Sequence, residues 1–205
     1  METFELKKEQ AKLTGKIVLR DGFEKVKTIA GAECIAVGNK VMASIVVCEF
    51  HSSKVLEYQT YLLSDPLPYH PEYVAYREMP ALVEAYNKLE QEPDVILVSG
   101  AGINHPRKIG IASHLGLILN KSTIGVMDKL ELGRVEHGKI MIGLDLAGFE
   151  IKTREHANPI YVSPGHLITP GSALKLVSKS IVYPHKMPEP LHLAHKFGKK
   201  NKEKV

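Results

Sequence analysis

One segment of this 205-residue chain places chemically useful residues at the end of a predicted strand. The segment reads VILVSGAGINHPRKIGIASH (95–114): four apolar residues lead to Ser99, and a glycine-rich turn, His-Pro-Arg and a helical pattern follow. A buried parallel strand delivers its last residue to the edge of a sheet in this way. Ser99 is therefore either a working group or the replacement of an acid. We do not predict a nucleophile, because the sequence arranges no His-Asp relay to activate the hydroxyl.

Four titratable residues, His105 of this segment and three elsewhere in the chain, are candidates for chemistry. Glu33 interrupts an apolar strand pattern, where an unpaired charge is costly, so we favour a metal ligand over an acid that reaches an edge or a lysine. Glu78 stands near a predicted helix start, which the helix dipole explains without any function. His105 follows the glycine turn and either contacts a phosphate or water, or bonds a loop carbonyl. Of two histidines three residues apart, His195 is the preferred site residue and His192 a surface residue.

The first half of the chain predicts three strands followed by a loop. Apolar runs with a tight-turn signal at 37–40 indicate an antiparallel meander, and three prolines in ten residues indicate the loop. A leading helix is expected within 3–20, and a later helix begins near Glu78 with Pro80 in its first turn. The predicted strands and loop are 27–37, 41–50, 54–63 and 64–73.

The second half alternates strands and helices before further strands. Short apolar runs predict buried strands, and a threonine followed by proline predicts a helix N-cap at Thr169. The expected elements are a strand at 94–98, a helix with a face from Ile111 to Leu119, a strand at 122–126, strands within 139–162 and a helix at 188–197. This order is that of an α/β ribonuclease H-like fold, a mixed sheet flanked by helices. In such a sheet the ends of the first and fourth strands lie side by side.

Composition sets limits on the class of protein. A hydrophobic content of 44% in 205 residues suits one domain, which we expect over 1–198, followed by a basic, disordered tail at 199–205. A net charge of +4 is compatible with a polyanionic partner but is weak support. Cys34 and Cys48 lie in strand-like runs and predict buried thiols in a reducing interior. No apolar run approaches the length of a membrane span, and the charged start lacks a secretory signal, so a soluble cytoplasmic protein is expected.

Six segments together resemble endonuclease V, a family of metal-dependent nucleases that cut beside deaminated bases. They occur in the family's order and cover nearly the whole chain. The segments are IAGAE (29–33), PYHPEYVAYREMPAL (68–82), ILVSGAGINHPRKIGIASHLG (96–116), STIGV (122–126), PIYVSPGH (159–166) and PEPLHLAH (188–195). The resemblance implies a ribonuclease H-like fold, Mg²⁺ or Mn²⁺ held by three carboxylates, and DNA or RNA with a deaminated base such as inosine as partner.

The departures from the family pattern gather at its active centre. Glu78 matches the family glutamate, Glu33 stands where the family has an aspartate, and Ser99 replaces a second aspartate. Ala101 stands for a histidine, Asp128 for a lysine and Glu72 for a glycine, whereas His105 and His195 match family site histidines. A neutral hydroxyl is a poor Mg²⁺ ligand, so the resemblance predicts a kept fold with altered chemistry.

The resemblance also implies residues that bind nucleic acid. A wedge whose tyrosine pushes into the strand matches Pro68, Tyr69, His70 and Pro71, although a packed proline-rich loop explains the same residues. A base pocket built from glycine backbone matches Gly100, Gly102 and Gly110. Glu72 would block the base in that pocket or repel phosphate, and lysines of the tail either track phosphates or only solubilise the chain.

Three explanations of the altered centre remain open. The first is loss of cleavage with binding retained, since catalytic groups that act as a unit fail together. The second is a relocated metal site of Glu33, Glu78 and Asp128. The third is ordinary activity with a weaker metal site. We rank them in that order, and a non-catalytic binding or scaffolding protein on the same fold is the alternative from another class.

Overall fold

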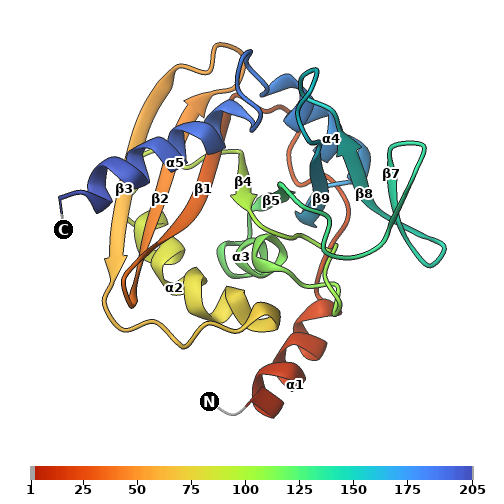
Figure 1. The fold of residues 1–205 in the computed structure, drawn as a ribbon, viewed down its shortest axis with the longest axis horizontal. Coiled ribbons are helices and arrows are strands. Elements are labelled where there is room, and N and C mark those ends of the chain that lie inside the picture. The colour runs from red at the N-terminus through yellow and green to blue at the C-terminus, as the bar shows by residue number, and fades with distance from the viewer. Residues whose placement is uncertain (1–2, 205) are drawn as a thin grey trace.

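A nine-stranded mixed sheet forms the centre of the computed structural model, which describes residues 3–204. The strand order is β3-β2-β1-β4-β5-β9-β8-β7-β6 (Figure 1). The strands are β1 (Thr28–Val37), β2 (Lys40–Glu49), β3 (Val55–Leu63), β4 (Val95–Ser99), β5 (Ser122–Met127), β6 (Arg134–Glu136), β7 (Lys139–Ile142), β8 (Asp145–Ile151) and β9 (Ile160–His166). The antiparallel meander β1-β2-β3 and the parallel strands β4 and β5 confirm the predicted α/β mixed sheet.

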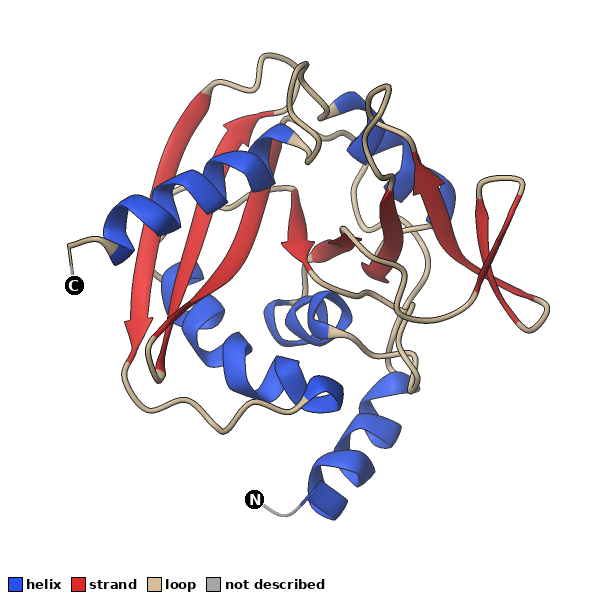
Figure 2. Ribbon diagram, viewed as in Figure 1, coloured by secondary structure: helices blue, strands red, loops and turns tan. Residues whose placement is uncertain are grey.

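Helices cover both faces of this sheet (Figure 2). On one face, α2 (Val74–Tyr86) and α3 (Ile111–Leu119) share a core with Ala32, Ile96 and Val98. On the other, α4 (Pro170–Lys179) and α5 (Glu189–Lys202) share a core with Ile29 and Leu97. Alternate residues of each central strand enter opposite cores, which is the period of two that an extended chain requires. The remaining helices are α1 (Thr3–Thr14) and the 3₁₀ turn η1 (Pro71–Tyr73).

The register of the central strands brings the candidate residues to one end of the sheet. β1 and β4 run parallel, and the last aligned pair is Ala32 with Val98. Glu33 and Ser99 therefore follow side by side where this ladder ends. Ser99 aligns in turn with Val126 of β5, two residues before Asp128. The predicted convergence of the first and fourth strand ends is confirmed.

Close packing of α5 on β1 fixes one wall of this end. A Cβ atom on Gly31 would lie 2.1 Å from the carbonyl oxygen of Pro190, so only glycine lets the helix start approach the strand so closely. The helix then crosses β1 and β2 (Figure 1). This packing places His195 of α5 over Glu33.

Two predicted helix boundaries differ from the structure, and β6 and the end of β9 lie outside the range 139–162 in which further strands were expected. α2 begins at Val74, not near Glu78, and Pro80 lies inside the helix, not in its first turn. Burial of Ala75 and Met79 against the sheet outweighs the hydrogen bond that Pro80 removes. α5 runs to Lys202, so the first part of the expected tail at 199–205 is helical.

Cys34 and Cys48 are free thiols, Cys48 buried and Cys34 partly buried. Across residues 3–204, no helix has the length and apolar character needed to cross a membrane.

Candidate active site

Glu33 of β1 and His195 of α5 form the closest polar pair at the strand ends. Glu33 Oε1 lies 3.0 Å from His195 Nδ1. Burial raises the pKa of the Glu33 carboxyl, while the hydrogen bond and charge of His195, and the charge of Lys199, lower it. Glu33 is therefore a partly buried acid whose side chain has His195 as its hydrogen-bond partner.

Glu78 adds a second carboxyl from α2. Burial raises the pKa of this group to about 7; the Arg77 charge opposes the shift and the Glu33 charge adds to it. Its backbone oxygen accepts a weak hydrogen bond from Cys34 Sγ at 3.7 Å, which ties α2 to β1 next to Glu33. The Glu33 charge therefore disfavours the charged form of Glu78, and a nearby cation would favour that form.

Ser99 supplies a neutral hydroxyl at the position between these acids and β5. In residues 3–204, no group of three or more His, Cys, Asp or Glu side chains is arranged so that it could hold a metal ion. Mg²⁺ is bound through one or two carboxylates, with water and phosphate oxygens completing its shell. The carboxylates of Glu33 and Glu78 are of the ligand type that Mg²⁺ takes, and a metal role for Glu33, Glu78 and Asp128 stays a prediction.

A first cleft of about 650 Å³ opens at these strand ends. It is lined by residues from β1, β4, α5 and the loops after β5 and β8, among them Glu33, Ser99, Asp128, Arg154, His192 and His195. Asp128 is exposed at its rim. Acids and bases thus share a cleft wide enough for a sugar-phosphate unit.

A second cleft of about 340 Å³ lies on the other side of the β4 end. Its lining includes Tyr69, Pro71, Glu72, Ala101, His105 and Gly110. Ser99 and Gly100 line both clefts. One strand end therefore separates the two compartments.

The glycine turn that builds the second cleft has little room for side chains. Gly100 adopts φ +137°, which other residues rarely adopt. A Cβ on Gly110 would lie 2.3 Å from the Ala101 oxygen, and one on Gly102 would lie 2.2 Å from the Pro164 oxygen. Gly102 thus serves packing against β9, while Gly100 and Gly110 expose backbone to the cleft.

The predicted wedge forms the outer rim of the second cleft. Tyr69 is 67% exposed, free to meet a ligand. His70 caps η1, since its Nδ1 accepts a hydrogen bond from the Glu72 amide at 3.3 Å. The wedge segment therefore ends in a fixed turn, with its tyrosine outside it.

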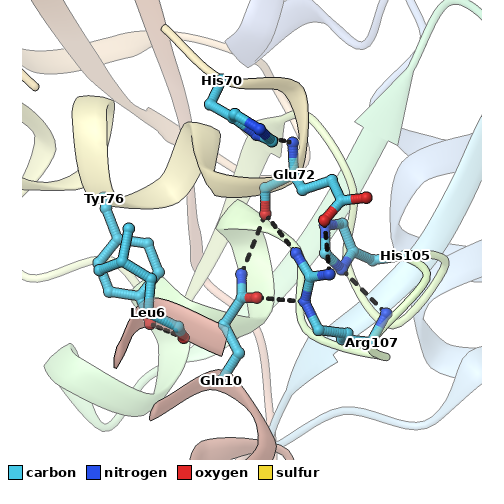
Figure 3. A network of polar contacts seen from close by, with 7 residues as sticks. All are labelled: Leu6, Gln10, His70, Glu72, Tyr76, His105 and Arg107. Atoms are coloured by element: carbon cyan, nitrogen blue, oxygen red, sulfur yellow. Dashed lines mark hydrogen bonds and ion pairs between the residues drawn. The ribbon is translucent and has the colours of Figure 1, made fainter. Parts of the chain in front are cut away.

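Arg107 and Gln10 are functional candidates that sequence reasoning missed or left aside. Arg107 Nη1 lies 2.7 Å from Glu72 Oε2, and Nη2 donates to the Glu72 backbone oxygen at 3.0 Å (Figure 3). Gln10 of α1 accepts from Arg107 Nε and donates to the same Glu72 oxygen at 3.1 Å. The Arg107 guanidinium also faces the Tyr73 ring at 4.9 Å. No sequence pattern linked position 10 to position 107.

His105 is uncharged at neutral pH. Burial and the Arg107 charge lower its pKa to about 4, and Glu72 only partly offsets this. Its Nδ1 accepts from the Arg107 amide at 3.3 Å. The other ring nitrogen of neutral His105 therefore carries the proton, so it can donate a hydrogen bond or orient a water, but the ring carries no charge for a phosphate.

The structure brings most of the predicted residues together and leaves some apart. Glu33, Ser99, Asp128 and His195 share the first cleft, whereas Tyr69, Pro71, Gly100, His105 and Gly110 line the second. In the described chain, the linings of these two clefts do not include Glu78, Pro68, His70 or Gly102. Glu78 of α2 is half-buried, and the Glu33 charge contributes to its raised pKa.

Comparisons with known proteins agree with this architecture. The sequence model of the Endonuclease V family matches residues 11–196. Endonuclease V of Dictyoglomus thermophilum is 32% identical over 97% of this chain and 89% of its own length. Endonuclease V of Thermofilum pendens is 36% identical over 85% of this chain and 78% of its own.

Solved structures give the same result at the level of the fold. The catalytic domain of human Endonuclease V superposes with a TM-score of 0.88 at 27% identity, covering 98% of this chain and 96% of that one. Ciona intestinalis Endonuclease V, in complex with a 24mer DNA containing an inosine followed by a ribo-adenosine, superposes with a TM-score of 0.88 at 26% identity, covering 98% and 97%.

Proposed function

Since the chain belongs to the endonuclease V family, we propose that it binds single-stranded DNA or RNA at a deaminated base, with strongly reduced metal-dependent cleavage. The observation that carries this proposal is the shared end of β4: Ser99 and Gly100 line both an acid-containing cleft and a glycine-walled one. A base in the second cleft would place neighbouring nucleotides over the first cleft, which Glu33 and Ser99 line.

The second cleft suits a base taken out of a stack. Its walls include backbone from the glycine turn, apolar side chains, a neutral histidine and the carboxylates of Glu72 and Glu131, and a flat ring fits among them. Tyr69 stands exposed beside it, where it can fill the gap that the displaced base leaves. The Ciona relative was solved with DNA that contains inosine, and we extend that ligand class to this chain.

The donors for a metal ion are incomplete. Glu33 and Glu78 would hold a Mg²⁺ or Mn²⁺ ion, and a bound ion would supply stabilisation of charge on a phosphodiester. Ser99 contributes only a neutral oxygen where the family has an acid. We therefore assign to this chain weak metal binding and a cleavage rate far below that of a three-carboxylate site.

A binding protein without catalysis is the second candidate. The neutral Ser99 at the strand end favours it, because the base cleft does not depend on the missing acid. We also propose a cytoplasmic location, which the two free thiols support.

Affinity measurements test the proposal without any metal. Fluorescence anisotropy should show that wild-type protein binds a labelled strand with one inosine more tightly than the same strand with adenine, and that both affinities fall with added salt. DNA and RNA versions of the strand would show which sugar is preferred. Equal affinity for the inosine and adenine strands would contradict recognition of a deaminated base.

A further inference from the structure

The second cleft contains a fixed carboxylate that a base would meet directly. Glu72 lines this cleft together with His105, and the two side chains lie next to each other in Figure 3. Glu131 is the other acid in its lining, and the described lining contains no lysine or arginine. A base that enters therefore faces hydrogen-bond acceptors more than cationic donors.

Arg107 fixes the position of this carboxylate. One guanidinium contacts Glu72 twice, at the side-chain oxygen and at the backbone oxygen, and the Tyr73 ring backs it. Gln10 and the hydroxyl of Thr14, which donates to the Arg107 oxygen at 2.8 Å, hold Arg107 from α1. Because the Glu72 side chain is already held in place, it loses little conformational entropy when a ligand binds.

The pairing leaves the carboxylate able to accept more hydrogen bonds. A carboxylate has about four lone-pair sites, and the contact with Arg107 Nη1 uses one of them. The Arg107 hydrogen bond and charge keep the Glu72 pKa below its usual range, so the group remains ionised at neutral pH. Glu72 is half-exposed, at 49% of its side chain, so a ligand can reach it.

Deamination creates the group that such a carboxylate recognises. Adenine presents a bare ring nitrogen at N1, whereas hypoxanthine carries N1–H; cytosine and uracil differ in the same way at N3. An ionised acceptor attracts the N–H and repels the lone pair of the parent base.

We propose that Glu72 selects bases with a ring lactam N–H, and that Arg107 and Gln10 are positioning residues that aim its carboxylate. This inference rests on the proposed function and names the residue that reads the base in this chain. Glu72, the acid expected to block the base, is thereby the group that recognises it.

The test compares one strand with three alternative bases at a single position: hypoxanthine, N1-methylhypoxanthine and adenine. Wild type should bind the hypoxanthine strand most tightly. Glu72→Gln, whose amide can donate to adenine N1, should lower the hypoxanthine-to-adenine affinity ratio about tenfold, the effect of one hydrogen bond to a charged group. Arg107→Lys, which keeps the charge but loses the fork, should lower the same ratio by a smaller factor.

Glu84→Gln is the matched control, because it removes an exposed carboxylate of α2 that lines neither cleft, and it should leave the ratio unchanged. Equal ratios in wild type and Glu72→Gln would overturn the inference while the proposed function stands. A fall of all three affinities by one factor would assign Glu72 a structural role and also overturn it. Wild-type protein that binds none of the strands would contradict the proposed function itself.

Discussion

Glu33 Oε1 and His195 Nδ1 lie 3.0 Å apart, although 162 positions separate the two residues in the chain. β1 carries the acid and α5 carries the histidine, so the pair depends on how tightly this helix sits on the strand. The contact explains why the end of the chain belongs to the site. The packing of α5 on β1 can therefore be tested by substitution.

Gly31→Ala should disturb the packing of α5 on β1. The new Cβ would lie 2.1 Å from the Pro190 oxygen, so α5 or β1 must shift, and we expect a loss of about 1–3 kcal/mol in the free energy of unfolding. Urea unfolding measures it. Gly171→Ala is the control, because no heavy atom lies within 4 Å of its new Cβ, and it should change stability by less than about 1 kcal/mol. Equal stability of both variants would contradict the close packing.

Tyr69→Ala should weaken binding without weakening the fold. The side chain is 67% exposed, so its removal leaves the core intact, whereas stacking on a base is worth about 1–3 kcal/mol. We expect about a tenfold loss of affinity for an inosine strand. Phe4→Ala, which truncates a 71% exposed aromatic on α1, should leave affinity unchanged. If Tyr69→Ala binds like wild type, the wedge role is wrong.

Acidification should destabilise the protein through His114. This side chain is 2% exposed, and burial lowers its pKa to about 4. The unfolded chain has a pKa of about 6.5, so below that pH the unfolded state binds a proton that the folded state does not. Stability is thus fully present above about pH 6.5 and falls as the pH drops toward 4, by about 1.4 kcal/mol per pH unit.

His114→Phe keeps a ring against Tyr76, whose ring centroid lies 5.0 Å away, and removes the titration. Urea unfolding at pH 7 and pH 4.5 should show a smaller pH-dependent loss for the variant than for wild type. His105, whose pKa is also about 4, keeps its own share in both proteins. An identical loss in the two proteins would exclude His114 as a source.

Asp128→Asn separates a weakened metal site from a relocated one. The side chain is exposed at the rim of the first cleft, and we assign metal binding to Glu33 and Glu78. Mn²⁺ affinity, measured by titration calorimetry, should therefore change less than about twofold in Asp128→Asn and fall at least about tenfold in Glu78→Gln. A matching loss in Asp128→Asn would show that Asp128 has replaced the missing acid.

Local patterns were sufficient to predict β1 to β5 but not β6 or the start of α2. Apolar runs separated by turn residues identify β1 to β5, because each strand must bury its own side chains wherever it pairs. Pro80 misled the boundary, since its effect on a helix is local whereas the burial of Ala75 and Met79 is decided by the distant sheet. Packing between elements outweighed the local signal.

Some residues of the site were likewise predictable from local patterns and others were not. Ser99 and Glu33 were recognisable because each breaks an apolar strand at its end or within it, and the strand register then brings them together. Gln10 and Arg107 could not be found, because their contact exists only after α1 docks beside the glycine turn. A hydrogen bond between surface-type residues leaves no periodicity in a sequence.

The most direct measurement follows cleavage of labelled DNA and RNA strands that each contain one inosine, in Mg²⁺ and then in Mn²⁺. Ser99→Asp restores an acid beside Glu33. Ser99→Asn is the control, because asparagine has the size of aspartate without its charge. We predict little cleavage by wild type and Ser99→Asn, and an increase of at least about a hundredfold in Ser99→Asp, with inosine binding unchanged in all three. Rapid cleavage by wild type that Ser99→Asp does not increase would contradict the loss of a metal-binding acid at this position.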